Sequence, residues 1–114
     1  MKFHFAHSAV LSFAFAVAAL SSSGGAFAVD EEAAKALMKT NDCTKCHAAD
    51  KDKVGPSYKN IAAKYKGKAD AEAAVTKVLT TGAKSSGGSE APHKIINTKD
   101  AKEIKNVVQW VLAQ

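Results

Sequence analysis

The chain has 114 residues, enough for one small domain, and its 46% apolar and 24% charged residues exclude a wholly disordered or collagen-like protein. Its 16 basic residues, all of them lysines, outnumber 11 acidic residues and give a formal net charge of +5. All five phenylalanines lie before position 29, so Tyr58, Tyr65 and Trp110 are the only aromatic residues of the remaining segment. A core of small aliphatic side chains is thin at this size, which indicates that something other than side chains fills the middle. Two cysteines exclude a many-bridged disulfide scaffold.

Residues 1–28 show the three parts of a secretory signal peptide. Lys2 supplies a positive charge near the start, Ala9–Leu20 form an apolar stretch, and the last three residues have the small-x-small pattern of a cleavage site. The apolar stretch is well short of the roughly 20 residues that span a bilayer. No arginine pair is present, so the leader is expected to be of the Sec type. We therefore expect cleavage of residues 1–28 and a periplasmic mature domain, residues 29–114, without a membrane span.

Capping signals and the spacing of apolar residues predict four helices in the mature chain, and no strand alternation competes with them. The expected helices are Glu31–Lys39 after an Asp30 cap, a second that Ser57 opens and that runs through Lys64, Ala71–Thr81 between an Asp70 cap and a Gly82 C-cap, and a last one that starts at Thr98. The Ser/Gly-rich loop Ala83–Asn97 before the last helix is long enough to suggest a function. The sequence therefore predicts an all-α domain.

The residues from Cys43 to His47 form the pattern Cys-x-x-Cys-His, which is typical of covalent c-type haem attachment. Two thiols three positions apart can reach the two vinyl groups on one side of a haem. A histidine directly after Cys46 then lies beneath the iron and presents its imidazole to it. Export of the chain agrees with this interpretation, because c-type haem is attached outside the cytoplasm in bacteria.

Three other interpretations of the two cysteines account for the motif less well. A thioredoxin-like dithiol is expected in a βαβ setting, and this chain shows only helices. A zinc site from Cys43, Cys46, His93 and His47 has adjacent ligands that suit a tetrahedral site poorly. A disulfide between Cys43 and Cys46 would close a very small loop and stabilise little. Haem alone accounts for both cysteines and the histidine.

With these residues the chain resembles class I c-type cytochromes of the short monohaem bacterial type, over nearly all of Glu31–Gln114. Besides the Cys-x-x-Cys-His motif, the resemblance rests on Val54–Lys59 and on Val108–Leu112. It implies a small cytochrome c fold of about four helices, wrapped around one haem c that is covalently attached through Cys43 and Cys46.

The same resemblance implies two contacts. The first and last helices should cross near Leu37, Met38, Trp110 and Val111. The carbonyl of Pro56 should accept a hydrogen bond from the His47 imidazole, which would fix the ring and raise its basicity as a ligand.

The second axial ligand is where the sequence departs from that family, in which a methionine in the loop before the last helix normally completes the coordination of the iron. After residue 28 the chain has one methionine, Met38, which precedes the haem motif and is expected in the core. His93 occupies the loop position of the expected methionine and is the only other histidine of this segment. We therefore expect His47 and His93 to ligate the iron from opposite faces. The alternatives are a five-coordinate iron or coordination by Asn97, Lys84 or Lys94.

Two strong protein ligands favour electron transfer over substrate chemistry, because such a haem changes little between its redox states. Axial methionine raises the potential of a haem, so histidine in its place predicts a lower one. The alternative function is binding or sensing of a small gas, in which His93 is displaced or absent from the iron. We expect no enzyme activity, since no catalytic triad and no phosphate-binding loop is present.

Lysines in the segments expected to flank the haem suggest what the partner looks like. They favour redox partner proteins with an acidic docking surface, held in weak and small encounters. The lysines concerned are Lys45, Lys51, Lys53, Lys59 and Lys94. Nucleic acid is not an expected partner, because the chain has no arginine and no aromatic stacking surface.

Overall fold

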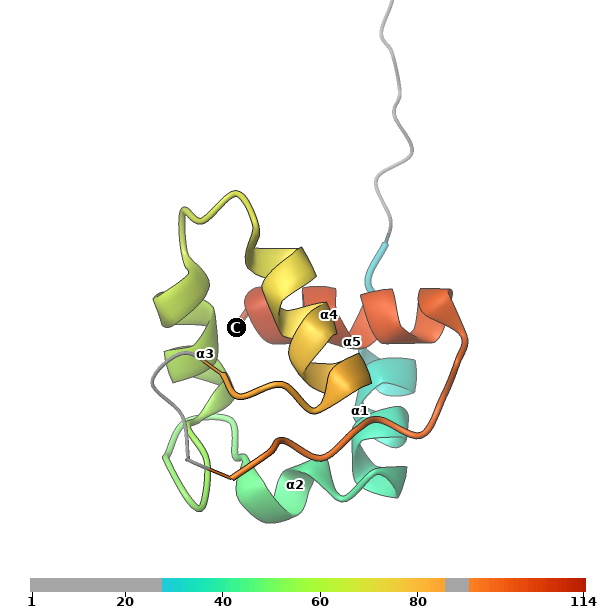
Figure 1. Cartoon of the computed structure of the whole chain (residues 1–114), viewed down its shortest axis with the longest axis horizontal. Coiled ribbons are helices and arrows are strands. Elements are labelled where there is room, and N and C mark those ends of the chain that lie inside the picture. The colour runs from blue at the N-terminus through green and yellow to red at the C-terminus, as the bar shows by residue number, and fades with distance from the viewer. Residues whose placement is uncertain (1–27, 86–90) are drawn as a thin grey trace, which may run out of the picture.

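The computed structural model describes residues 28–85 and 91–114. Within these ranges the chain forms five helices and no strand (Figure 1). The helices are α1 (Glu31–Thr40), α2 (Cys43–Cys46), α3 (Tyr58–Tyr65), α4 (Ala71–Thr81) and α5 (Ala101–Leu112). None of the helices in the described ranges is long and apolar enough to cross a membrane. The expected signal peptide, apart from Ala28, and the Gly87-Gly88 part of the loop lie outside the described residues.

Short-range capping explains three ends of the first three predicted helices, whereas Asp70, the expected cap of α4, precedes that helix without a side-chain capping hydrogen bond. The Asp30 side chain accepts a hydrogen bond from the Ala33 N–H at 2.9 Å at the start of α1. Ser57 does the same for the Asn60 N–H at 3.1 Å at the start of α3. Gly82 ends α4 in the left-handed region, with a φ of 70°, as its C-cap position predicts. These helices are confirmed to within one residue at each end.

The last helix begins at Ala101, so the predicted start at Thr98 was wrong. Asp100 is the residue that caps it, and its carboxylate accepts from the Lys102 N–H at 2.8 Å. The Thr98 hydroxyl accepts from the Asp100 N–H at 3.1 Å and donates to the Glu103 carboxylate at 2.6 Å. Thr98 therefore supports the cap from outside the helix instead of opening it.

Helix α2, the one-turn helix on the haem motif, was not predicted. Four residues are too few to show an apolar period. The turn is set from outside by Asp42, which precedes it with a φ of 59° in the left-handed region. This conformation is uncommon for residues other than glycine, although Asp and Asn tolerate it.

Helix α5 is the centre of the fold, and α1, α3 and α4 all pack against it (Figure 1). Val107 and Val108 of α5 are only 2% and 1% exposed. The predicted packing of the first helix on the last is present, and Met38 lies with Trp110 in one buried cluster, as expected for a core residue.

A buried amide ties the start of α1 to the middle of α5. Asn106 accepts from the Asp30 N–H at 2.8 Å and donates to the Asp30 carbonyl at 2.7 Å. Both backbone groups of Asp30 are thereby satisfied by one side chain. The segments before and after α2 and the segment before α5 line one hollow.

Candidate functional site

One cavity of about 310 Å³ is lined by all five residues that the sequence proposes for the haem site: Cys43, Cys46, His47, Pro56 and His93. They come from different parts of the chain: the haem motif, the turn after it and the segment before α5. Much of the remaining wall is apolar and is drawn from α3, α4 and α5. The apolar residues that α3, α4 and α5 contribute to the wall include Ile61, Val75, Leu79, Val107 and Val111. Such a cavity suits a large apolar ligand fixed by a few polar groups.

Helix α2 places both cysteines on the cavity wall. Residues three positions apart share one face of a helix, so Cys43 and Cys46 are neighbours across one turn. Both thiols are unpaired and partly buried. Burial raises the pKa of the Cys43 thiol above its ordinary value of 9.0.

The His47 ring is fixed by a backbone carbonyl. His47 Nδ1 lies 2.6 Å from the Pro56 carbonyl oxygen. A carbonyl can only accept, so the proton is assigned to Nδ1, and Nε2 keeps its lone pair for a metal. The centre of the His47 ring lies 5.7 Å from the centre of the Tyr58 ring. The Tyr58 ring meets the Trp110 ring edge-on, with 5.2 Å between the ring centres.

His93 faces His47 across the cavity. Its Nδ1 lies 2.7 Å from the Lys94 carbonyl oxygen, which again leaves Nε2 available. The two imidazole centres are 6.1 Å apart, with 25° between the ring planes. One iron bound to both Nε2 atoms, at metal–nitrogen distances of about 2 Å, separates two ring centres by about 6 Å. The distance between the ring centres therefore allows two imidazoles on one metal ion, and the two ring planes lie nearly parallel, in a stacked arrangement.

Of the other candidate ligands, Lys94 and the core residue Met38 also line this cavity, whereas Lys84 and Asn97 are not among its lining residues. Lys94 Nζ lies 3.1 Å from the Asp42 carboxylate. Lys84 and Asn97 are exposed, and the sulfur-bearing side chain of Met38 is buried in the core. Among the described residues, no three His, Cys, Asp or Glu side chains gather as a metal site.

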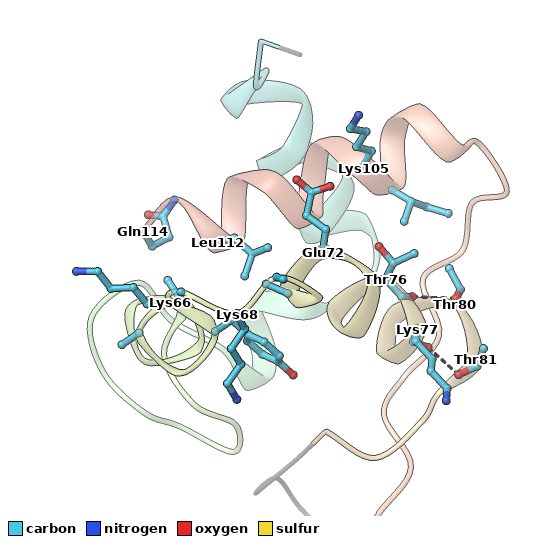
Figure 2. Close-up of a pocket in the computed structure, with 18 of the residues that line it drawn as sticks. Lys66, Lys68, Glu72, Thr76, Lys77, Thr80, Thr81, Lys105, Leu112 and Gln114 are labelled. Carbon is cyan, nitrogen blue, oxygen red and sulfur yellow. Dashed lines mark hydrogen bonds between the residues drawn. The ribbon is translucent and has the colours of Figure 1, made fainter. Parts of the chain in front are cut away.

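A larger hollow of about 1500 Å³ between α3, α4 and α5 lacks the features of a site. In Figure 2 the labelled lysine side chains of this hollow do not meet at one point. The hydroxyls of Thr80 and Thr81 donate to carbonyls of their own helix, at 2.8 and 2.6 Å (Figure 2). The labelled polar groups of this larger hollow therefore do not converge on one point. The cavity with His47 and His93 differs, because two imidazole rings face each other there.

The family model for cytochrome c matches residues 31–114. Cytochrome c-551 of Pseudomonas aeruginosa is 36% identical over 91 residues, which cover 79% of this chain and 82% of the relative. The chain belongs to the cytochrome c family. Its relatives are electron carriers and not enzymes, and they carry one covalently attached haem c.

Two solved structures share the fold of this cytochrome. The class 1 cytochrome MtoD from Sideroxydans lithotrophicus ES-1 is 53% identical, with a TM-score of 0.67 over 75% of this chain and 97% of that protein. Wild-type cytochrome c552 of Nitrosomonas europaea is 33% identical, with a TM-score of 0.60 over 69% of this chain and 96% of that protein. The small cytochrome c fold predicted from the sequence is confirmed.

The cavity of this cytochrome fits haem c on its own chemistry. Cys43 and Cys46 are the two thiols that the covalent attachment requires. The Tyr58 hydroxyl is a hydrogen-bond donor at neutral pH, and burial raises its pKa further, from 10.0 to about 12. Within the described residues this buried hydroxyl has no acceptor, and Tyr58 lines the cavity. An orphaned buried donor here is the feature expected where a bound group completes the site.

Gly55, which the sequence pattern did not single out, makes room for the ring of His47. A Cβ at this position would lie 2.5 Å from His47 Cε1 and 2.9 Å from Nδ1. Such contacts are far inside van der Waals distance, so only glycine lets the ring reach the Pro56 carbonyl. The resemblance covered Val54–Lys59, but it did not reveal that a ring lies over Gly55.

Gly55→Ala is expected to displace the His47 ring and to destabilise the cytochrome by about 1–3 kcal/mol, as overpacking does. The ferric absorption spectrum should gain a high-spin component, and urea unfolding should shift to lower denaturant. Gly67→Ala is the matched control. Gly67 has a positive φ of 77° but no atom within 4 Å of an added Cβ, so its variant should lose stability without a spectral change. An unchanged spectrum for Gly55→Ala would contradict the role assigned to Gly55.

Asp52 holds the turn on which His47 depends, and this residue was also missed. Its carboxylate accepts from the Ser57 N–H at 2.6 Å and from the Asn60 side-chain amide at 2.9 Å. The backbone bond from Ser57, followed by the one from Asn60, lowers the pKa of Asp52 below its ordinary value of 3.8.

A lowered pKa in the folded state makes the turn sensitive to acid. The stabilisation from Asp52 is fully present above pH about 4 and is lost as the pH falls through the lower folded pKa. Asp52→Asn should therefore flatten the acid limb of a plot of unfolding free energy against pH. Glu32→Gln, which removes an exposed carboxylate of α1, serves as the control. Equal acid limbs for wild type and Asp52→Asn would show that this carboxylate does not support the turn.

Proposed function

We propose that this protein is an exported, periplasmic electron carrier whose single haem iron is held by His47 on one face and by His93 on the other. The observation that carries the proposal is the facing pair of imidazoles, 6.1 Å apart, each with its Nδ1 against a backbone carbonyl. The signal-peptide pattern of residues 1–28 supports export.

The bound haem supplies reversible one-electron chemistry. In this proposal Cys43 and Cys46 hold it covalently. The Pro56 carbonyl orients the His47 ring and raises its basicity, as outer partners of ligating histidines do. The apolar wall around the site excludes water and disfavours the more charged redox state. These roles together fix the ligands in place, so that little rearrangement accompanies electron transfer.

The proposed potential is lower than that of relatives with an axial methionine. Methionine raises the potential of a haem, and His93 occupies the loop position where this family normally has it. A redox titration of the purified protein tests this expectation. A midpoint typical of methionine-ligated members would contradict His93 as a ligand.

The mouth of the cavity is proposed as the docking face for an acidic partner. Val54 and Ile95 line the cavity and are 82% and 53% exposed, so they give this face an apolar centre. Lys94 also lines the cavity, and Lys45 and Lys53 lie next in sequence to lining residues. Lys53 donates to the Thr44 carbonyl at 2.9 Å, and both Lys45 and Lys94 pair with Asp42. Electron transfer from a cognate partner should slow as ionic strength rises, because exposed charges are screened.

Carbon monoxide added to the reduced protein separates electron transfer from the gas-binding alternative. An iron with two firmly held imidazoles should show little change in its spectrum. Rapid and complete formation of a carbonyl spectrum would contradict the proposal and favour a gas-binding haem protein.

A further inference from the structure

The segment that carries His93 is held on its α4 side by backbone hydrogen bonds. The His93 N–H donates to the Gly82 carbonyl at 3.1 Å, and the Ile96 N–H donates to the Leu79 carbonyl at 2.8 Å. Ile96 is buried, at 5% exposure. These bonds fix the segment relative to the end of α4, but they do not fix it relative to the haem motif on the other side of the cavity.

The connection to the haem motif is made by a buried amide. The Oδ1 atom of Asn41, two residues before Cys43, accepts from the Asn97 N–H at 2.6 Å. Its Nδ2 donates to the Leu37 carbonyl at 2.8 Å, so both ends of the amide are used and its orientation is fixed. Asn41 is only 5% exposed.

We propose that Asn41 is a positioning residue for the second axial ligand. Through the Asn97 N–H it sets the separation between the haem motif, which carries His47, and the segment that carries His93. The proposal rests on the proposed ligation by His93. Asn41 ends α1, and its side chain spans from that helix to a residue 56 positions later in the chain.

A second link between the same segments is much weaker. Lys94 pairs with Asp42 at 3.1 Å, but the two side chains are 62% and 45% exposed. Exposed ion pairs contribute little, because water and salt screen them. The Asn41 bond is shielded, and its loss leaves the Asn97 N–H without this acceptor. The buried amide therefore dominates the positioning.

Cyanide binding to the ferric holoprotein measures how firmly His93 is held, since cyanide must displace it from the iron. Asn41→Leu keeps a similar volume and removes both polar atoms. The expected result is an increase of about tenfold or more in cyanide affinity, as follows from losing a buried hydrogen bond. Asn41→Ser, whose hydroxyl is too short for the same bond, should act in the same direction if the leucine variant yields no holoprotein.

Three further variants separate positioning from a general role at the end of α1. The Thr40 hydroxyl donates to the same Leu37 carbonyl at 2.9 Å, so Thr40→Val removes a bond there without touching the His93 segment. Asp42→Asn removes the exposed ion pairs with Lys94 and Lys45, and asparagine tolerates the left-handed backbone. Both should leave cyanide affinity within about twofold of wild type. Asn41→Asp retains the acceptor for the Asn97 N–H but loses the donor to the Leu37 carbonyl, so it should return the affinity only part of the way towards wild type.

Unchanged cyanide affinity in the leucine or serine variant, with only a loss of unfolding free energy, would overturn the positioning role. An equal rise in affinity for Thr40→Val would overturn it as well. Failure of the proposed function is seen separately, as a ferric spectrum that does not change when His93 itself is replaced.

Discussion

Replacing His93 with alanine is expected to convert the ferric protein from a low-spin to a high-spin form. The imidazole is a strong ligand, and alanine leaves that face of the iron to water or to no ligand. The Nε2 atom of His93 is the only one of its two ring nitrogens available, because Nδ1 faces the Lys94 carbonyl at 2.7 Å. Absorption and electron paramagnetic resonance spectra of the ferric protein measure the change.

Lys94→Gln is the matched control for this variant. It removes the neighbouring side chain, which is itself one of the alternative ligands, and breaks the exposed pair with Asp42. Its ferric spectrum should stay low-spin. A low-spin His93→Ala protein together with a high-spin Lys94→Gln protein would assign the ligand to Lys94 instead.

Replacing His93 with methionine should raise the reduction potential by on the order of 100 mV, within the range of about 0.8 V that axial ligands span. Thioether sulfur favours the ferrous state relative to imidazole. The segment should present the new side chain to the same cavity, because it is anchored by backbone bonds at His93 and Ile96. A redox titration, together with a methionine–iron charge-transfer band in the ferric spectrum, measures the result.

The Lys94→Gln protein again gives the reference, since it alters the charge near the haem without changing the expected ligands. Its potential should move far less than that of His93→Met. A methionine variant that shows the charge-transfer band at an unchanged potential would contradict the claim that the ligand sets the potential. A variant with neither band nor shift would place position 93 away from the iron.

The ends of the helices could be predicted from the sequence where short-range capping determines them. Asp30, Ser57 and Gly82 act through bonds to neighbours within four residues, so their roles follow from short-range geometry. Thr98 and Asp100 are both good capping residues, and the sequence does not show which of them accepts from the first turn. The structure resolves this, because Thr98 bonds to Asp100 and Glu103 and leaves the cap to Asp100.

The sequence names candidates for the chemistry-bearing residues of the site, but it does not name the residues that position them. The Cys-x-x-Cys-His spacing and the small number of histidines identify the candidates without any fold. Gly55 and Asn41 act through contacts made only after folding: a ring passing over a glycine, and an amide bonded to a backbone group 56 residues away. Neither contact leaves a pattern in one sequence.

The central claim is that one iron is held between His47 and His93. A crystal structure of the haem-loaded protein tests it most directly, through the distances from the iron to the two Nε2 atoms. We expect both distances to be about 2 Å, with each Nδ1 still against its carbonyl. An iron bound by His47 alone, or by a residue other than His93 on the opposite face, would contradict the claim.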